Sequence, residues 1–439
     1  MLNPATPPST TASPEPLPNQ SHYRDDSDSS SDNSSDSSSA NSIDYDIAIV
    51  GGGIVGLTLA CALKTSGLRV ALIEAKPREA GLLRHRAYAL TLLSGRIFEG
   101  LGVWGEILPQ ITTFQTIRLA DAKHPTVIDL QPTDLGTQEL GYVAEHQVLV
   151  QALYHCLEGA TQVTWRCPAE VVSVQPLRDY TEVTLLEAGQ PHTLRAQVLV
   201  AADGSRSPLR DRLGIQTTGW KYWQSCVTAV IRPEKAHGDI AREHFWPSGP
   251  FATLPLPDNR CQIVLTAPHA EAKRFLEMDV QDFLSELDRR YDHQLGRLEL
   301  VGDRYLFPVQ LMHSRQYVQP RLALVGDAAH CCHPVGGQGL NLGIRDAAAL
   351  AQVLQAAHQR GEDLGSLAVL QRYQHWRRWE NWIILWFTDL LDRSFSNTLF
   401  PILVARRWGL NLMARLGLLR SLALRLMTGL SGKLPDLAR

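Results

Sequence analysis

The glycine-rich turn at residues 51–56 limits what this chain can fold into more than any other feature. It follows a short apolar run, 46–50, of the kind found in buried parallel strands, and it precedes a helix-compatible stretch, 57–66. A second apolar run, 69–73, ends at Glu74. The order strand, turn, helix, strand within about 30 residues predicts a βαβ unit of a nucleotide-binding sheet.

The turn contains the residue types that a dinucleotide pyrophosphate requires. In the pattern G-x-G-x-x-G, Gly51 permits the tight turn, Gly53 lets the backbone approach the pyrophosphate, and Gly56 lets the helix pack closely. The phosphates would lie at the positive end of the helix, and Glu74 can accept hydrogen bonds from ribose hydroxyls. The motif alone does not distinguish FAD from NAD.

Two later apolar runs also end in turns that contain glycine and aspartate. Run 197–202 leads to Asp203 and Gly204, and run 321–325 leads to Asp327. Both runs have the length and composition of further strands of the same sheet. Asp327 is therefore placed to bind hydroxyl groups of an extended cofactor.

A glycine-rich segment, 333–341, follows and opens a helix that we expect over 340–357. Its backbone N–H groups are placed to face an electron-rich group, and the helix start can stabilise negative charge. His330 and His333 also allow a metal site. We disfavour that alternative because no third ligand is near and the glycines would be unexplained.

The remaining sequence predicts a second, sheet-based domain. Segments 115–130 and 225–267 alternate apolar and polar residues, as antiparallel strands do, and the chain is helical in pattern from about 365. We expect a disordered Ser-, Asp- and Pro-rich tail at 1–43, a Rossmann-type domain at 44–112, 141–210 and 302–360, a substrate-binding sheet domain at 113–140 and 211–301, and a helical region at 361–439.

Composition excludes some classes of protein and compartment. The net charge of −3 gives no reason to expect a nucleic-acid partner. The seven cysteines are scattered without metal spacing, which indicates reduced thiols in a cytoplasmic-type compartment. The tail lacks the apolar core of a secretory signal, so we expect a cytoplasmic protein.

The three motifs, in this order, resemble those of the class A flavoprotein monooxygenases, the group with the para-hydroxybenzoate hydroxylase fold. Further matches at 86–90, 101–104, 141–145 and Gly249-Pro250 are most similar to the ubiquinone-biosynthesis hydroxylases, and the resemblance spans roughly 44–432. It implies an α/β fold: a Rossmann-type FAD-binding domain, an inserted antiparallel-sheet substrate domain and a C-terminal helical segment.

The resemblance also implies roles for individual residues. Those expected to hold the ADP half of FAD are Gly51, Gly53, Gly56 and Glu74. Arg86 would lie near the pyrophosphate, Asp327 near the ribityl or pyrophosphate region, and Asp203 with Gly204 would serve both FAD and NAD(P)H. Those expected beside the isoalloxazine are Pro334, Gly337, Gly339 and Asn341. Flavin contacts by His146, Gln147 or Gln151 stay open.

The implied reaction is the hydroxylation of a polyprenylated phenol in quinone biosynthesis, with NAD(P)H and O2, through a flavin C4a-hydroperoxide. The sequence names no catalytic base and no metal. Residues that could form substrate-pocket walls, or equally be plain core or surface, are Tyr222, Trp223, His244, Phe245, Trp246 and Pro250. Alternatives are a flavin-dependent prenyl-chain reductase, a halogenase, whose Trp-x-Trp-x-x-Pro signature is missing, and a non-catalytic prenyl-lipid carrier.

Segment 393–433 contains seven basic residues and no acidic one, interspersed with apolar side chains. No stretch of about 18 apolar residues occurs there, so a membrane span is not expected. The pattern suits peripheral contact with an anionic membrane, and equally a helical pair packed on the FAD domain with exposed arginines. A homo-oligomer or a biosynthetic complex is compatible with the sequence.

Overall fold

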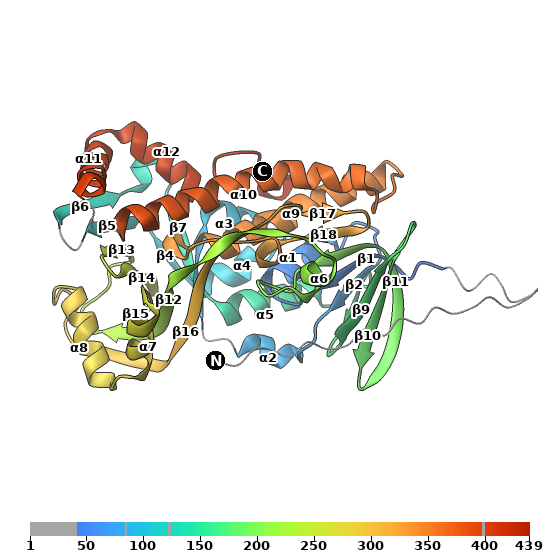
Figure 1. Cartoon of the computed structure of the whole chain (residues 1–439), viewed down its shortest axis with the longest axis horizontal. Coiled ribbons are helices and arrows are strands. Elements are labelled where there is room, and N and C mark those ends of the chain that lie inside the picture. The colour runs from blue at the N-terminus through green and yellow to red at the C-terminus, as the bar shows by residue number, and fades with distance from the viewer. Residues whose placement is uncertain (1–41, 84–85, 122–123, 397–399) are drawn as a thin grey trace, which may run out of the picture. The chain divides into compact units, whose positions relative to one another are not determined.

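The structure is a computed structural model that describes residues 42–83, 86–121, 124–396 and 400–439. The tail expected at 1–43 falls almost wholly outside the described residues. Residues 43–439 form one unit, in which two large sheets are joined by a small one and covered by helices (Figure 1).

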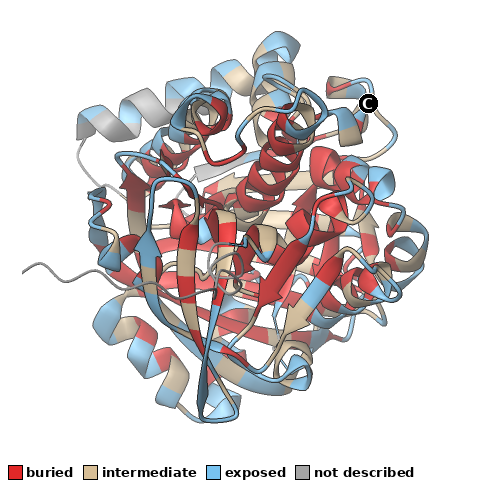
Figure 2. Cartoon of the chain, turned by 90° about the vertical axis from the view of Figure 1, so that its right-hand side faces the viewer, coloured by how far each residue is buried: buried red, intermediate tan, exposed pale blue. Residues whose placement is uncertain are grey.

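The first sheet is built on strands whose paired central segments are apolar, as predicted. Its parallel core consists of β1 (Tyr45–Val50), β2 (Val70–Ile73), β11 (Gln190–Ala201) and β18 (Leu322–Leu324), in the order β18–β11–β1–β2. Such strands are buried on both faces, which explains their continuous hydrophobic runs (Figure 2). The outer members are β8 (Val163–Arg166), β17 (Val318–Gln319) and the hairpin β9 (Glu170–Pro176) with β10 (Thr181–Glu187).

Helices α1 (Ile54–Leu63), α5 (His146–Leu157) and α9 (Gln338–Gln359) accompany this sheet. Helix α1 packs between the other two, and nine of its ten residues are buried. Such a helix has no polar face, which is why its sequence is apolar all round. The shorter helices are α2 (Arg78–Leu82), α3 (Leu92–Gly100), α4 (Trp104–Ile107) and α6 (Pro208–Arg212).

The second sheet has the order β19–β16–β12–β15–β14–β13–β5–β6. Its strands are β5 (Thr116–Asp121), β6 (His124–Leu130), β12 (Thr217–Pro233), β13 (Ile240–Trp246), β14 (Gly249–Leu256), β15 (Arg260–Pro268), β16 (Leu298–Ser314) and β19 (His330–Cys331). Helices α7 (His269–Glu277) and α8 (Val280–Arg290) enclose an apolar core on one face of it. Because β16 runs from 298 to 314, this sheet crosses the boundary expected at 302.

The third sheet, β3 (Ala87–Thr91), β7 (Gly141–Glu145) and β4 (Thr112–Phe114), lies between the two large ones. The C-terminal helices are α10 (Leu367–Phe395), α11 (Phe400–Arg415) and α12 (Gly417–Met427). Arg420 of α12 forms an ion pair with Asp134 at 2.8 Å, which ties this helix to the short 3-10 helix Pro132–Asp134 that follows β6. Among the described helices, none has both the length and the apolarity to cross a bilayer.

Candidate active site

The glycine turn between β1 and α1 is shaped by contacts that exclude side chains. Gly51 has φ +115°, and a Cβ there would overlap the Ala202 carbonyl oxygen. A Cβ on Gly56 would overlap the Gly51 carbonyl oxygen. Gly53 differs, because nothing lies within 4 Å of its Cβ position and the residue lines a cavity. The free N–H groups at the start of α1 therefore meet open space that an anionic group can fill.

Glu74 follows β2 at the same edge of the sheet. Its carboxylate accepts hydrogen bonds from the Gly52 N–H at 2.7 Å and from the Lys76 N–H at 2.9 Å. These bonds hold the carboxylate beside the glycine turn, where Glu74 and Lys76 line the cavity.

The second motif follows β11 and faces the same space. Asp203 Oδ2 accepts a hydrogen bond from the Leu209 N–H at 3.3 Å, while buried Oδ1 has no partner among the described residues. Burial raises the pKa of this carboxyl. Arg210 donates to the Ser205 carbonyl at 3.1 Å and to the Ala328 carbonyl at 3.3 Å, and so ties the second motif to the third.

The third motif follows β18 and opens α9. Asp327 lines the cavity. The surrounding protein shields its carboxyl from water, and this desolvation raises the pKa of the carboxyl. Pro334, Gly337 and Gly339 line the cavity as well, and Gly337 is the left-handed N-cap of α9 with φ +62°. The start of a 22-residue helix thus points its unpaired N–H groups toward the same space.

Asn341 does not line the cavity but supports the loop from behind. Its fully buried amide accepts hydrogen bonds from the Thr91 N–H at 2.9 Å and the Ser94 hydroxyl at 2.7 Å, and donates to the carbonyls of Ala89 at 2.8 Å and Gly337 at 2.7 Å. Asn341 therefore fixes β3 to the loop that precedes α9, and its expected contact with an isoalloxazine stays a prediction.

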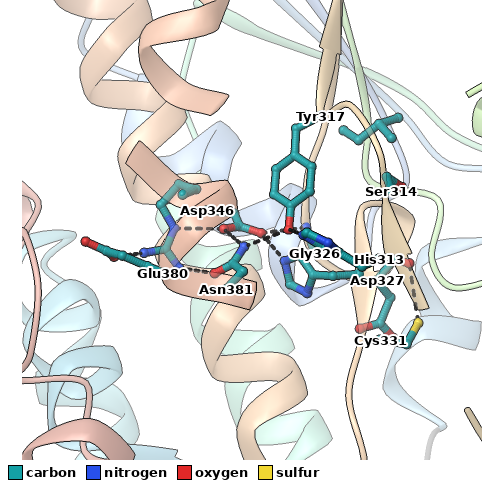
Figure 3. Close-up of polar contacts among 12 residues, drawn as sticks. His313, Ser314, Tyr317, Gly326, Asp327, Cys331, Asp346, Glu380 and Asn381 are labelled. Carbon is teal, nitrogen blue, oxygen red and sulfur yellow. Dashed lines mark hydrogen bonds and ion pairs between the residues drawn. The ribbon is translucent and has the colours of Figure 1, made fainter. Parts of the chain in front are cut away.

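A buried polar network centred on Asp346 anchors the third motif (Figure 3). Asp346 accepts hydrogen bonds from Arg377 at 2.9 Å, Asn381 at 3.0 Å and the Gly326 N–H at 3.1 Å, and pairs with His330 Nε2 at 2.5 Å. Despite burial, His330 and Arg377 hold the pKa of this carboxyl below its usual range. His330 therefore has a structural partner. The described residues contain no group of three or more potential ligands placed to hold a metal ion.

The three motifs surround one elongated cavity of about 1550 Å³. One end lies against the first sheet. The other is walled by the second sheet and the C-terminal helices, with Phe245, Phe307, Phe387 and Phe395 among its lining. Arg86 lies between the two, with its guanidinium 4.7 Å from the ring centre of Phe307. This volume exceeds the roughly 300–1,000 Å³ of a pocket for one drug-sized ligand, so a cofactor and a second molecule fit together.

The residues present fit FAD. The glycine turn at 51–56, with the start of α1, forms a cradle. A Cβ atom would overlap the backbone at Gly51 and Gly56, whereas the position of Gly53, where a pyrophosphate would approach, is open. Glu74 suits the ribose, and the unpartnered Asp203 Oδ1 offers an acceptor to a hydroxyl. His146 also lines the cavity, held by the Gly81 carbonyl at 2.9 Å and by Tyr88, whereas Gln147 and Gln151 are exposed elsewhere.

Of the expected pocket-wall residues, only Phe245 lines the cavity. On β13, the cavity lining includes Ala241, Arg242, Glu243 and Phe245. The alternation of a strand places Glu243 on the same face as Ala241 and Phe245, so His244 and Trp246 face the opposite side, toward α7 and α8.

The other expected wall residues are also outside the lining. Tyr222 is buried and donates to Asp389 Oδ1 at 2.5 Å, while Pro250 is buried in β14 and Trp223 is exposed. The wall residue that sequence reasoning missed is Glu243. The alternation of side chains along a strand could have identified it. Once Phe245 is taken as a wall residue, Glu243, two positions earlier on the same strand, must share its face.

Comparison with known proteins agrees with this geometry. The FAD binding domain family matches residues 44–387. The chain is 38% identical to a ubiquinone hydroxylase of Rhodospirillum rubrum, over 87% of this chain and 88% of that protein. It is 36% identical to 3-demethoxyubiquinol 3-hydroxylase of Escherichia coli, over 88% and 98%. The fold matches the crystal structure of p-nitrophenol 4-monooxygenase from Pseudomonas putida with a TM-score of 0.75 and 20% identity, over 89% and 99%.

The fold and site define a flavoprotein monooxygenase. More particularly, the chain belongs to the FAD binding domain family, and the relatives that it resembles include hydroxylases named for ubiquinone.

Proposed function

We propose that the protein hydroxylates the phenolic ring of a polyprenylated intermediate in quinone biosynthesis, with FAD as cofactor and NAD(P)H and O2 as co-substrates. The observation that carries this proposal is the single cavity that runs from the glycine cradle to an aromatic, apolar chamber. The names of the two relatives support a substrate from quinone biosynthesis. When bound and reduced, FAD would supply the activation of O2.

The protein's part is to bind, orient and exclude water. The turn at 51–56 and the start of α1 would hold the pyrophosphate, and Glu74 the adjoining ribose. The start of α9, capped by Gly337, would stabilise negative charge on a reduced ring. The apolar walls of the chamber would keep the reacting ring dry, which suppresses side reactions with water.

The C-terminal helices supply the route for an apolar tail. Their inner face lines the chamber through Phe387, Leu391, Met413 and Leu424. Their outer face carries exposed apolar side chains, with exposed fractions of 61% for Trp379, 52% for Trp386, 75% for Trp408, 73% for Leu418 and 55% for Leu422. Exposed tryptophans and leucines among basic residues suit the interface of an anionic bilayer. We infer that this outer face rests on such a membrane and receives the substrate from it.

Binding to vesicles tests this surface. We expect the protein to sediment with vesicles that contain phosphatidylglycerol, and the double variant W386S/W408S to lose most of that binding at low salt. The matched control is Leu186→Ser, which removes an exposed apolar side chain from β10 of the first sheet. Equal binding by both variants and the wild type would contradict the assignment of the surface. Side chains of Arg406 and Arg407 lie outside the described part of the chain.

Product analysis tests the reaction. FAD-loaded protein, NADH or NADPH, and a geranyl-substituted phenol should give substrate-stimulated oxidation of the nicotinamide and a product heavier by one oxygen atom. A product that gains two hydrogen atoms instead would identify a prenyl-chain reductase. Protein that binds the prenylphenol but retains no flavin would identify a lipid carrier.

A further inference from the structure

The chamber contains one carboxylate from the second sheet, that of Glu243, whose neighbours on the flanking strands are apolar and whose charged neighbour on its own strand is Arg242. The other acidic residues that line the cavity belong to the first sheet or to the segments that follow its strands: Glu74, Glu170, Asp203, Asp211 and Asp327. Among the described acidic residues of the lining, Glu243 alone comes from the second sheet, on β13. Its partners in register are Leu119 on β5 and Ala252 on β14, and both line the cavity.

Glu243 lies opposite the loop that precedes α9. The Gly336 backbone lies close enough to its carboxylate to favour the charged form and oppose part of the rise in its pKa. Gly336 adjoins Gly337, the N-cap at which a flavin ring would lie, and both line the cavity. Within the described ranges, no basic side chain forms an ion pair with Glu243. A structural salt bridge therefore does not explain why a carboxylate stands at this position.

We propose that Glu243 receives the proton of the substrate's phenolic hydroxyl while the ring is hydroxylated, an assignment that rests on the proposed function. The phenolic O–H bond breaks, its electron pair stays on the ring oxygen, and the proton bonds to a carboxylate oxygen. The ring becomes more electron-rich, and its attacked carbon would bond to one oxygen of O2 that two electrons from NAD(P)H have reduced to the peroxide level, as the O–O bond breaks. The other oxygen would leave with the electron pair of that bond, take the proton that the attacked carbon loses, and end as water. The ring oxygen takes its proton back from Glu243, which restores the phenol and the carboxylate.

The surroundings give this carboxylate the basicity that the transfer needs. Burial raises the pKa of Glu243 to about 8, against a partial opposing effect of the Gly336 backbone. A phenol has a pKa of about 10, so the transfer is far less uphill than to an ordinary carboxylate. The ionisable groups around it are Arg242, its neighbour on β13 that also lines the cavity, and Cys226 of β12. Burial raises the pKa of the Cys226 thiol to about 12; the Glu243 charge contributes, and the charge of Arg86 opposes the rise. The facing residues of β5 and β14 carry no charge.

Turnover of FAD-loaded Glu243→Gln with a geranyl-substituted phenol tests the proposal. In the wild type, kcat should rise as pH passes about 8, because the base must be ionised. In Glu243→Gln, we expect kcat for hydroxylation to fall about 100-fold or more, the rise with pH to vanish, and KM to stay within a few-fold. Glu243→Asp should recover part of the rate. A Glu243→Gln variant with the wild-type rate and pH profile would overturn the proposal.

A binding measurement keeps this test separate from that of the proposed function. If the wild type hydroxylates no phenol, the proposed function fails, and affinity for the geranylphenol is then compared with affinity for the same molecule without its hydroxyl. A wild-type preference for the phenol that Glu243→Leu abolishes would still assign the hydroxyl to Glu243. Equal affinity of the wild type for the two molecules would overturn that assignment.

Discussion

Replacing Gly53 by alanine should separate cofactor binding from folding. Gly53 is the N-cap of α1 with φ −75° and ψ 176°, a conformation that alanine adopts without strain, and its Cβ would meet no atom within 4 Å. We therefore expect the free energy of unfolding of the apoprotein to stay within about 1 kcal/mol of the wild type. The added methyl would occupy the space through which the backbone approaches the pyrophosphate.

The expected loss of FAD affinity follows from that displacement. A hydrogen bond to a charged group contributes about 1.5–3 kcal/mol, so the loss of one such bond should weaken binding about 10- to 140-fold. Titration of apoprotein with FAD, followed by flavin fluorescence, measures the affinity, and thermal unfolding of apoprotein measures stability.

Gly56→Ala is the matched control for this prediction. Its Cβ would overlap the Gly51 carbonyl oxygen, so α1 must shift and the apoprotein itself should lose stability. The reasoning is refuted if Gly53→Ala binds FAD as tightly as the wild type, or if it destabilises the apoprotein as much as Gly56→Ala does.

Three further predictions concern buried or cofactor-facing carboxylates. Asp346→Asn should cost about 3–5 kcal/mol of unfolding free energy, because Arg377 loses its buried counter-charge; urea unfolding measures this, with little change expected for exposed Glu277→Gln. Glu74→Gln should weaken FAD binding by up to about tenfold in a fluorescence titration, with an unchanged affinity counting against the ribose assignment. Burial raises the pKa of Glu243 from 4.5 to about 8. Its contribution to apoprotein stability is therefore fully present below about pH 4.5 and is lost as pH rises through 8. Glu243→Gln should remove this pH dependence from the unfolding curves, and a dependence that persists in the variant would contradict the assignment.

Local sequence patterns predicted the nucleotide-binding half well. The strand before Gly51, the helix after it and the runs that end at Asp203 and Asp327 all lie where the apolar patterns place them, because parallel strands and their turns follow from local composition. The fold class was predicted for the same reason. Apolar runs do not reveal hydrogen bonds between residues far apart in the sequence. The bonds from Asn341 to the Ala89 and Gly337 carbonyls, which place it behind the loop, could therefore be found only in the structure.

The substrate half was predicted less well, and strand geometry is the cause. An aromatic residue on a strand faces the cavity or the opposite core according to one residue of register, and composition does not decide which. His244 and Trp246 lie on the far side of β13 for this reason, while Phe245 and Glu243 face the chamber. Tyr222 is directed to Asp389 of α10, a contact across 167 residues that no local pattern contains.

Labelled oxygen tests the central claim most directly. FAD-loaded protein would be given NAD(P)H and a geranyl-substituted phenol under ¹⁸O₂ in ordinary water, and the product analysed by mass spectrometry. A flavoprotein hydroxylase with this cavity should place one ¹⁸O atom in each product molecule. A hydroxylated product without the label, or one that has gained only hydrogen, would contradict the account.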